Sequence, residues 1–349
     1  MNRPLAVLFV SLGFAFSAGA ASADDATPIN ISYQPGTFTA LPYYIASQKG
    51  WWKVVGLQPT LVGFPSGPPQ VAASASKSWD VGEAGSPPAV LGAVRYNLVT
   101  IGLSDDGSSI NQILAHHGAA AALKKNPSSL KGQQVLLTSN STGEYATSSC
   151  LKHFGLSESD VQIVNMAPAQ LVSAFSSGTG AIAGTWTPYA NTVRDKASAD
   201  ILCTGKDAGV GIPSVLFARG EYARAHPDLV AKSLAVYLHG VSWIRAHPEL
   251  AQQAFLEFNH QSGSTITVDD VKAELAIHPT FDLDEELKLL DTAHGPSTAT
   301  KWFDGIVAFM KEKGSIDQSP DPKSFLTDEY LKLVLKDPKL RQFANAHDS

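Results

Sequence analysis

Cysteine is scarce in this chain, with 2 among 349 residues. So few cysteines exclude a disulfide-dense secreted scaffold and a four-cysteine zinc site. Charged residues are sparse at 17%, and the 26 Lys and Arg are outnumbered by 32 Asp and Glu, giving a net charge of −6. This balance disfavours a nucleic-acid-binding protein. The HExxH, GxSxG and P-loop patterns are also missing, so zinc hydrolysis, a serine nucleophile elbow and a phosphate-binding P-loop lack sequence support.

Long apolar runs are rare, and the one at the N-terminus has the form of a signal peptide. Arg3 precedes an apolar run from Leu5 to Phe16, and small residues follow up to Ala23. We expect residues 1–23 to be removed before Asp24. The run is too short for a membrane span, and there is no twin arginine or lipoprotein cysteine. No later run reaches about 18 apolar residues, so the sequence predicts a soluble exported protein with no membrane crossing.

Apolar residues make up 44% of the chain, which is enough for a substantial core and argues against disorder or a coiled coil. The length allows about two domains. Strand-like runs alternate with helical patterns, which predicts an α/β fold of two doubly wound series. The expected strands are 29–33, 57–62, 79–84, 98–103, 135–138, 161–164, 181–185, 200–203 and 214–218; the expected helices are 41–49, 68–77, 89–96, 144–154 and 169–176.

From Glu221 onward helical periodicity replaces strands, which predicts a helical C-terminal tail packed on one of two lobes. The segment Arg224–Leu229 recurs 21 residues later as Arg245–Leu250. In each copy a proline followed by an acidic residue is typical of a helix start, so His226 and His247 are interpreted as capping or pre-proline residues. The pair at residues 116–117 has no histidine partner at helical spacing, and we expect no metal site and no cofactor.

Four loops follow strands and lead into helices, the place where α/β sheets bind ligands. They are residues 34–37, 85–87, 140–143 and 185–189. The third loop, Asn140-Ser141-Thr142-Gly143, offers hydroxyls and free backbone N–H groups at a helix start, which suits an anion. Simple N-capping explains the same residues. Aromatic side chains flank the loops and serve either as cleft walls or as core: Tyr33, Phe38, Tyr43, Trp186 and Tyr189.

Five segments together resemble the extracytoplasmic solute-binding proteins of ABC importers, in the nitrate, sulfonate and taurine group. They are ISYQPGTFTALPYYIASQKGWW (31–52), WDVGEAGSPPAVLGAV (79–94), NSTGEYATSSCLKHFGL (140–156), APAQLVSAFSSGTGAIAGTWTPY (167–189) and YLHGVSWIRAHPELA (237–251). The resemblance covers most of residues 29–255.

This resemblance implies the periplasmic binding protein type II fold, with two α/β lobes joined by two crossover strands. Lobe 1 is expected to comprise residues 27–110 and 219–349, and lobe 2 residues 111–218. The implied protein is a periplasmic monomer without catalytic activity. It captures a small organic anion or related polar solute between the lobes and delivers it to a permease and ATPase complex in the inner membrane. The implied ligand-binding residues are Gln34, Thr37, Gly85, Ser86, Ser141, Thr142, Trp186 and Thr187.

Three positions depart from the family pattern. Thr187 stands where an acidic residue often lies between Trp and Pro, which favours a ligand without a cationic group. Asn140 replaces the first glycine of the third loop. Glu144 follows that loop, and it would repel a sulfonate or carboxylate if its side chain faced the cleft.

Two other functions remain open at this point. Pyrimidine-precursor synthases of thiamine biosynthesis are related in sequence, but they carry a cysteine-rich metal motif, whereas this chain has only Cys150 and Cys203. Alternatively, the loaded protein presents its ligand to a membrane sensor.

Two pairs of residues also need interpretation. Cys150 and Cys203 form a disulfide if their Cα atoms lie within about 7 Å, and otherwise are two buried thiols. The pair Asp105-Asp106 is interpreted as a turn or a solvated edge.

Overall fold

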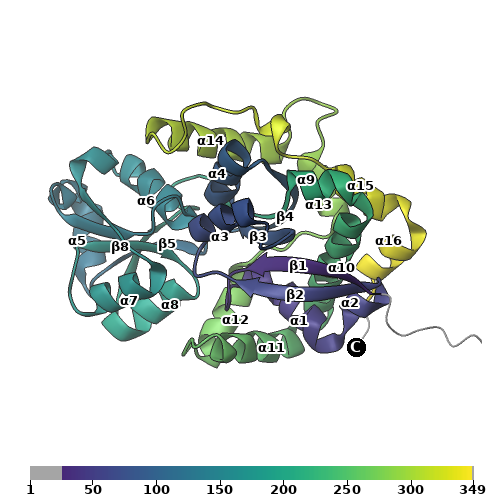
Figure 1. The fold of residues 1–349 in the computed structure, drawn as a ribbon. Coiled ribbons are helices and arrows are strands. Elements are labelled where there is room, and N and C mark those ends of the chain that lie inside the picture. The colour runs from purple at the N-terminus through teal and green to yellow at the C-terminus, as the bar shows by residue number, and fades with distance from the viewer. Residues whose placement is uncertain (1–25, 348–349) are drawn as a thin grey trace, which may run out of the picture.

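The computed structural model describes residues 26–347, and the predicted signal peptide lies outside them. Two five-stranded sheets form separate lobes (Figure 1). The first sheet, in spatial order, contains β2 (Leu57–Gly63), β1 (Thr27–Tyr33), β3 (Val81–Gly85), β10 (Pro213–Arg219) and β4 (Leu98–Asp106). The second contains β7 (Gln162–Asn165), β6 (Gln134–Leu137), β8 (Ile182–Trp186), β5 (Asn111–Ala115) and β9 (Asp200–Thr204).

The chain crosses between the sheets twice, at residues 107–110 and 205–212. The two crossings run side by side, since the N–H of Gly107 donates to the carbonyl of Ile212 at 2.8 Å. We call residues 26–106 and 213–347 lobe 1, and residues 111–204 lobe 2. The predicted α/β fold with two crossover segments is confirmed.

The expected boundary after residue 218 is wrong by one strand. Strand β10 belongs to the first sheet, where it pairs antiparallel with both β3 and β4. Its sequence shows a buried strand, but periodicity carries no information about which sheet receives it. The returning strand fills the gap between β3 and β4, so the sheet of lobe 1 is mixed rather than parallel.

Helices flank both sheets at places that the strand–helix alternation predicts. The sequence did not predict strand β5 or the helices α2 (Trp51–Val54), α5 (Ala119–Lys125) and α8 (Tyr189–Ala197). Strand β5 lacks β-branched residues apart from Ile113, which explains why its pattern is weak. The helices of lobe 1 before the crossing are α1 (Leu41–Lys49), α2 (Trp51–Val54), α3 (Gly67–Ala73) and α4 (Ser86–Tyr96). Those of lobe 2 are α5 (Ala119–Lys125), α6 (Thr142–His153), α7 (Pro168–Ser176) and α8 (Tyr189–Ala197).

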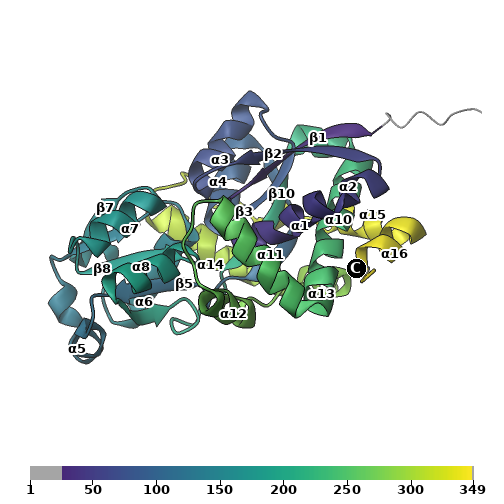
Figure 2. The same cartoon turned by 90° about the horizontal axis from the view of Figure 1, so that it is seen from below.

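The C-terminal part of the described chain is helical, as predicted. Figures 1 and 2 show it packed mainly around lobe 1, with α10 beside α1 and α14 beside α4. Both copies of the repeated segment begin helices, because Pro227 opens α10 and Pro248 opens α11, with His226 and His247 at the N-cap positions. The tail helices are α9 (Gly220–Ala225), α10 (Pro227–Ala246), α11 (Pro248–Gln261), α12 (Val268–Ile277), α13 (Leu283–Leu290), α14 (Thr298–Glu312), α15 (Glu329–Lys336) and α16 (Pro338–Ala344).

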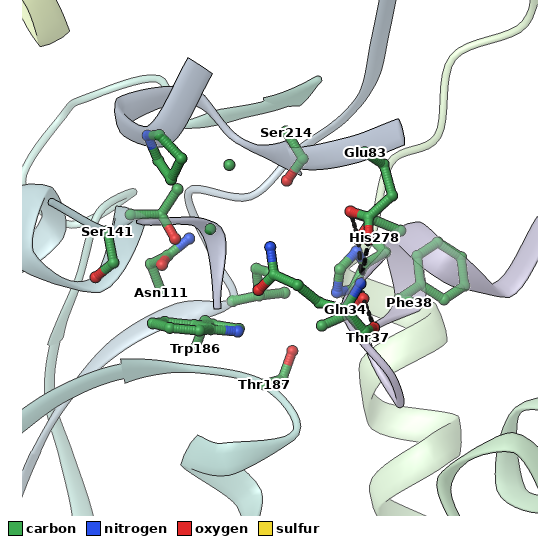
Figure 3. A pocket seen from close by; sticks show the side chains of 16 residues that line it. Gln34, Thr37, Phe38, Glu83, Asn111, Ser141, Trp186, Thr187, Ser214 and His278 are labelled. Carbon is green, nitrogen blue, oxygen red and sulfur yellow. Dashed lines mark hydrogen bonds between the residues drawn. The ribbon is translucent and has the colours of Figure 1, made fainter. Parts of the chain in front are cut away.

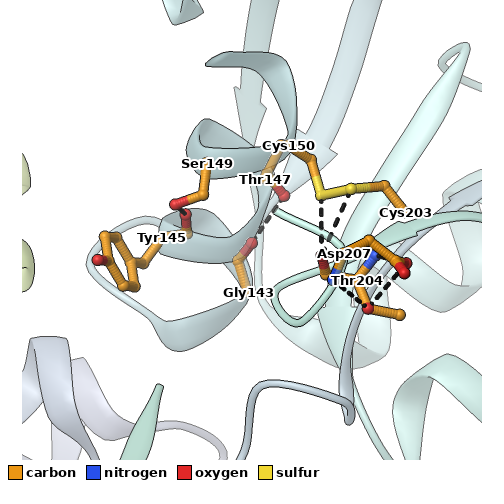
Figure 4. Close-up of a disulfide and its surroundings, with 8 residues drawn as sticks. All are labelled: Gly143, Tyr145, Thr147, Ser149, Cys150, Cys203, Thr204 and Asp207. Carbon is orange, nitrogen blue, oxygen red and sulfur yellow. Dashed lines mark hydrogen bonds between the residues drawn. A yellow bond between two sulfur atoms is a disulfide. The ribbon is translucent and has the colours of Figure 1, made fainter. Parts of the chain in front are cut away.

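Cys150 and Cys203 form a disulfide, which settles the alternative left open by the sequence. Their Cα atoms are 6.2 Å apart, and the bond joins α6 to β9 within lobe 2 (Figure 4). The helix that follows the third loop is therefore covalently tied to the sheet behind it.

No helix within residues 26–347 combines the length and apolarity needed to cross a membrane. In the same residues, no three His, Cys, Asp or Glu side chains are arranged to hold a metal ion.

Candidate solute-binding cleft

A cavity lies between the two lobes, next to the paired crossings (Figure 3). The space between the surrounding protein atoms is about 470 Å³ when the part open to solvent is counted. Seven of the eight predicted ligand-binding residues line it, and Ser86 lies directly after the lining residue Gly85. The lining residues are Gln34, Thr37, Phe38, Thr39, Gly67, Glu83, Gly85, Pro88, Ile110, Asn111, Ser141, Thr142, Trp186, Thr187, Ser214 and His278.

The first loop turns sharply after β1 and is held by hydrogen bonds of its own backbone and hydroxyl groups. Gly36 has φ 82°, a left-handed conformation that glycine adopts without strain. The hydroxyl of Thr37 donates to the carbonyl of Gln34 at 2.8 Å. Both side chains are buried and line the cleft.

Glu83 of β3 lies beneath this loop as a buried carboxylic acid that the sequence analysis missed. It accepts from the N–H of Gln34 at 2.9 Å and from the hydroxyl of Thr39 at 2.6 Å. Loss of hydration on burial raises the pKa of Glu83 to about 7, although both hydrogen bonds act in the opposite direction. The side chain is 1% exposed, so its main role in this structure is to hold the first loop.

The second loop brings the lobes into contact. Gly85 ends β3, and a Cβ placed there would lie 2.4 Å from the methyl Cγ2 of Thr142 in lobe 2. Glycine is therefore required for this close approach, not for its backbone conformation, because φ is −71°. The next residue, Ser86, begins α4; its hydroxyl is buried and has no hydrogen-bond partner in the described part of the chain.

The third loop caps α6, as the alternative reading of the sequence predicts, and it also lines the cavity. The hydroxyl of Ser141 accepts from the N–H of Glu144 at 3.2 Å and donates to the carbonyl of Thr138 at 2.6 Å. Asn140 has φ 59°, a left-handed conformation that asparagine adopts more readily than most residues other than glycine. Glu144 is absent from the cavity lining, so it does not face the cleft.

The fourth loop contributes Trp186 at the end of β8 and Thr187 directly after it. Trp186 is 6% exposed and packs edge-on against Tyr189, with ring centroids 5.7 Å apart. Tyr189 itself lines a different hollow, between α7, α8 and the end of α11. The hydroxyl of Thr187 donates to Glu274 of α12 at 2.7 Å, which joins lobe 2 to the tail of lobe 1.

Two more buried acids, Asp105 and Glu274, lie beside this wall and face the same histidine, His278. His278 Nδ1 bonds to Asp105 at 2.8 Å, and its Nε2 lies 3.4 Å from Glu274. Burial lowers the pKa of His278, but the bonds to both acids outweigh this effect and raise it to about 9. The interpretation of Asp105 as part of a turn or solvated edge is wrong, since it lies within the buried strand β4, one residue before its end, and is 1% exposed.

Sequence reasoning missed His278 and Glu274 because they come from the tail, more than 160 residues from Asp105. No local pattern marks them. For Asp105 the sequence offers one signal, which is an acidic residue just after the carboxyl end of a predicted strand.

Within residues 26–347, no lysine or arginine lines this cavity. Positive potential comes from the start of α6, where Thr142 and Gly143 lack intrahelical acceptors for their N–H groups. At α4 the two prolines after Ser86 remove donors, leaving mainly the serine and the helix dipole. The cavity is therefore built from hydroxyls, amides, helix ends and an indole ring.

Binding proteins from two bacteria are similar to this chain in sequence. A protein of Bacillus subtilis strain 168, described as an aliphatic sulfonates-binding protein, is 28% identical over 338 residues, covering 95% of this chain and 96% of its own. The taurine-binding periplasmic protein of Escherichia coli K12 is 29% identical over 175 residues, covering 48% of this chain and 51% of its own. Both relatives are described as binding proteins, which agrees with the expectation of a protein without catalytic activity.

Solved structures confirm the fold. The periplasmic aliphatic sulphonate-binding protein SsuA of Escherichia coli superposes with a TM-score of 0.71 at 19% identity, covering 88% of this chain and 99% of its own. The periplasmic nitrate-binding protein NrtA of Synechocystis PCC 6803 gives a TM-score of 0.68 at 14% identity, covering 90% of each chain. Residues 37–251 match the family described as NMT1/THI5 like. The chain belongs to this family, and it has the two-lobed fold of the periplasmic solute-binding proteins.

Proposed function

We propose that this protein is the periplasmic solute-binding component of an ABC importer and captures a small organic anion of the sulfonate class. The observation that carries the proposal is the cleft itself: Ser141 and Thr142 at the start of α6 line it together with Gly85 of the other lobe and the ring of Trp186. One relative over almost the full length is described as an aliphatic sulfonates-binding protein, and another as an ABC transporter periplasmic binding protein, which supports the ligand class and the delivery of solute to a permease and ATPase.

The polar part of the cleft suits a singly charged anion. Free N–H groups and hydroxyls at a helix start bind oxyanions without a cationic side chain. In the proposal, Ser141, Thr142, Gly85 and Ser86 hold the anionic head. The cavity also has apolar walls, contributed by Phe38, Pro88, Ile110 and the ring of Trp186, which suit an alkyl or aryl group on that head.

The acids near the cleft argue against a ligand with an amine. Glu274 already accepts from Thr187 at 2.7 Å and from the amide of Asn191 at 3.3 Å, and it faces His278. Glu83 is likewise occupied by Gln34 and Thr39. Neither acid is available to pair with an ammonium group, so an alkanesulfonate is favoured over taurine.

The ligand class is tested by measuring the Tm of the mature chain against a panel of solutes. The panel contains butanesulfonate, taurine, an aryl sulfonate, a sulfate ester, benzoate, nitrate and a pyrimidine. A ligand at 100 times its Kd stabilises the folded state by about 2.7 kcal/mol, which is a readily measured rise in Tm. We expect the largest rise with butanesulfonate, and absence of a rise with every solute would contradict the proposal.

A further inference from the structure

Glu144 is a fully buried carboxylate in the first turn of α6, just behind the loop that forms one wall of the cleft. One of its oxygens accepts from the backbone N–H of Asn140 at 2.6 Å. The other accepts from the ammonium group of Lys313. The two partners come from different lobes, because Asn140 belongs to lobe 2 and Lys313 to the tail of lobe 1.

Lys313 directly follows α14, the tail helix that lies beside α4 (Figure 1). Its side chain is 20% exposed, and its ammonium group also lies 3.5 Å from Glu158 of lobe 2. Burial raises the pKa of Glu158, and the charge of Lys313 opposes that rise. The lysine therefore lies between two acids of lobe 2, both partly or fully withdrawn from water.

The position of Glu144 matters for any anion in the cleft. As the third residue of α6, it lies at the positive end of the helix, the same end that Thr142 turns toward the cavity. A buried carboxylate without a cationic partner would cancel that positive potential and repel an anion. The structure supplies the compensating charge from the other lobe.

We infer that Lys313 is a positioning residue for the solute site. It neutralises Glu144 and leaves the start of α6 able to bind an anion. Lys313 is not one of the residues that line the cavity, and it acts on the site through Glu144. Because Lys313 comes from the tail of lobe 1, one lobe supplies the charge that compensates an acid beside the anion site of the other. This inference rests on the proposed function, since it assumes an anionic solute.

The test is a double-mutant cycle read by calorimetric titration with butanesulfonate. Lys313→Met leaves Glu144 uncompensated, so we expect the Kd to rise at least tenfold. Glu144→Gln keeps an oxygen acceptor for Asn140 and removes the charge, so the Kd should stay equal or fall. The double variant should return to within about threefold of the unmodified protein. Lys301→Met, at an exposed lysine of α14, removes an equal charge and should leave the Kd unchanged.

The Kd values of the single and double variants distinguish charge compensation by Lys313 from a purely structural role in joining the lobes. If Lys313 acts only by joining the lobes, the double variant stays as weak as Lys313→Met, and that result would overturn the inference, as would an unchanged Kd in Lys313→Met. Circular dichroism verifies that each variant is folded.

A ligand-independent measurement keeps the two proposals distinguishable. The Tm of Lys313→Met without solute should fall by about 5 °C, as expected for an unpaired buried charge, and Glu144→Gln should restore most of it. If the unmodified protein binds no solute of the panel, the proposed function fails, while this Tm pattern still decides whether Lys313 compensates Glu144. An unchanged Tm in Lys313→Met would refute the pairing.

Discussion

At the residue scale, the proposed anion contacts depend on hydroxyls that the protein also uses to stabilise itself. Ser141 caps α6 and lines the cleft at the same time. Ser141→Ala should therefore weaken butanesulfonate binding at least tenfold and lower the free energy of unfolding by about 1 kcal/mol through the lost cap. Calorimetric titration and urea unfolding measure the two effects. Ser139→Ala, in the same loop but outside the lining, serves as the control; equal binding by both variants would remove Ser141 from the site.

Trp186 provides the apolar wall of the same site, and its loss should act on affinity for the organic group. We expect Trp186→Ala to weaken butanesulfonate binding at least tenfold and methanesulfonate binding less, because the longer chain offers more apolar area to the indole ring. Titration with both sulfonates measures the difference. An equal loss for the two ligands would show that Trp186 does not contact the alkyl chain.

The raised pKa of Glu83 predicts that the folded protein loses stability as the pH rises. Its folded pKa of about 7 lies above the usual 4.5, so the folded state holds the proton more tightly than the unfolded chain. The resulting stability, about 3 kcal/mol at most, is present below pH 4.5 and is lost as the pH rises through 7. The free energy of unfolding of the unmodified protein should thus fall relative to Glu83→Gln between pH 5 and pH 8. Parallel unfolding curves at every pH would contradict this assignment.

At the scale of single elements, the disulfide ties α6 to β9 and closes a loop with a sequence separation of 53 residues. Loop closure of this length stabilises the folded state by about 4 kcal/mol in the chain-entropy model. Reduction, or the pair Cys150→Ser and Cys203→Ser, should lower the Tm accordingly. Alkylation followed by mass measurement should detect no free thiol before reduction and two afterwards. Two free thiols in the unreduced exported protein would contradict the bond.

The elements also show what sequence patterns can and cannot predict. Strand–helix alternation and the prolines before Asp228 and Glu249 identify most elements, because these signals are local. The four loops follow from the rule that ligands bind at the carboxyl ends of strands. The placement of β10 was missed because sheet partners are chosen by long-range packing, which leaves no mark in a short apolar run.

At the scale of the whole molecule, three charged or titratable residues near the site that the sequence did not predict come from the helical tail. His278, Glu274 and Lys313 reach the interlobe region from helices that pack mainly on lobe 1, and each depends on contacts more than 80 residues away in sequence. No local sequence pattern indicates that these side chains lie near the cleft. The sequence predicts repulsion by Glu144 only if its side chain faces the cleft, and the fold instead pairs this buried carboxylate with Lys313.

The close contact between Gly85 and Thr142 allows a separate test of whether the two lobes must approach each other to bind the ligand. Gly85→Ala places a methyl group against Thr142 Cγ2, so the lobes cannot approach fully. We expect at least tenfold weaker butanesulfonate binding with little change in the Tm of the ligand-free protein. Thr142→Ser removes the opposing methyl group and should restore binding to Gly85→Ala. Failure of that rescue would indicate that Gly85 is needed for a reason other than close contact.

The central claim is that one small organic anion is held between the lobes. Native mass spectrometry of the mature chain with butanesulfonate tests it most directly. The account predicts one sulfonate per chain at micromolar concentration, with occupancy reduced in both Ser141→Ala and Gly85→Ala. A spectrum showing only the unliganded chain, or equal occupancy in the unmodified protein and both variants, would contradict it.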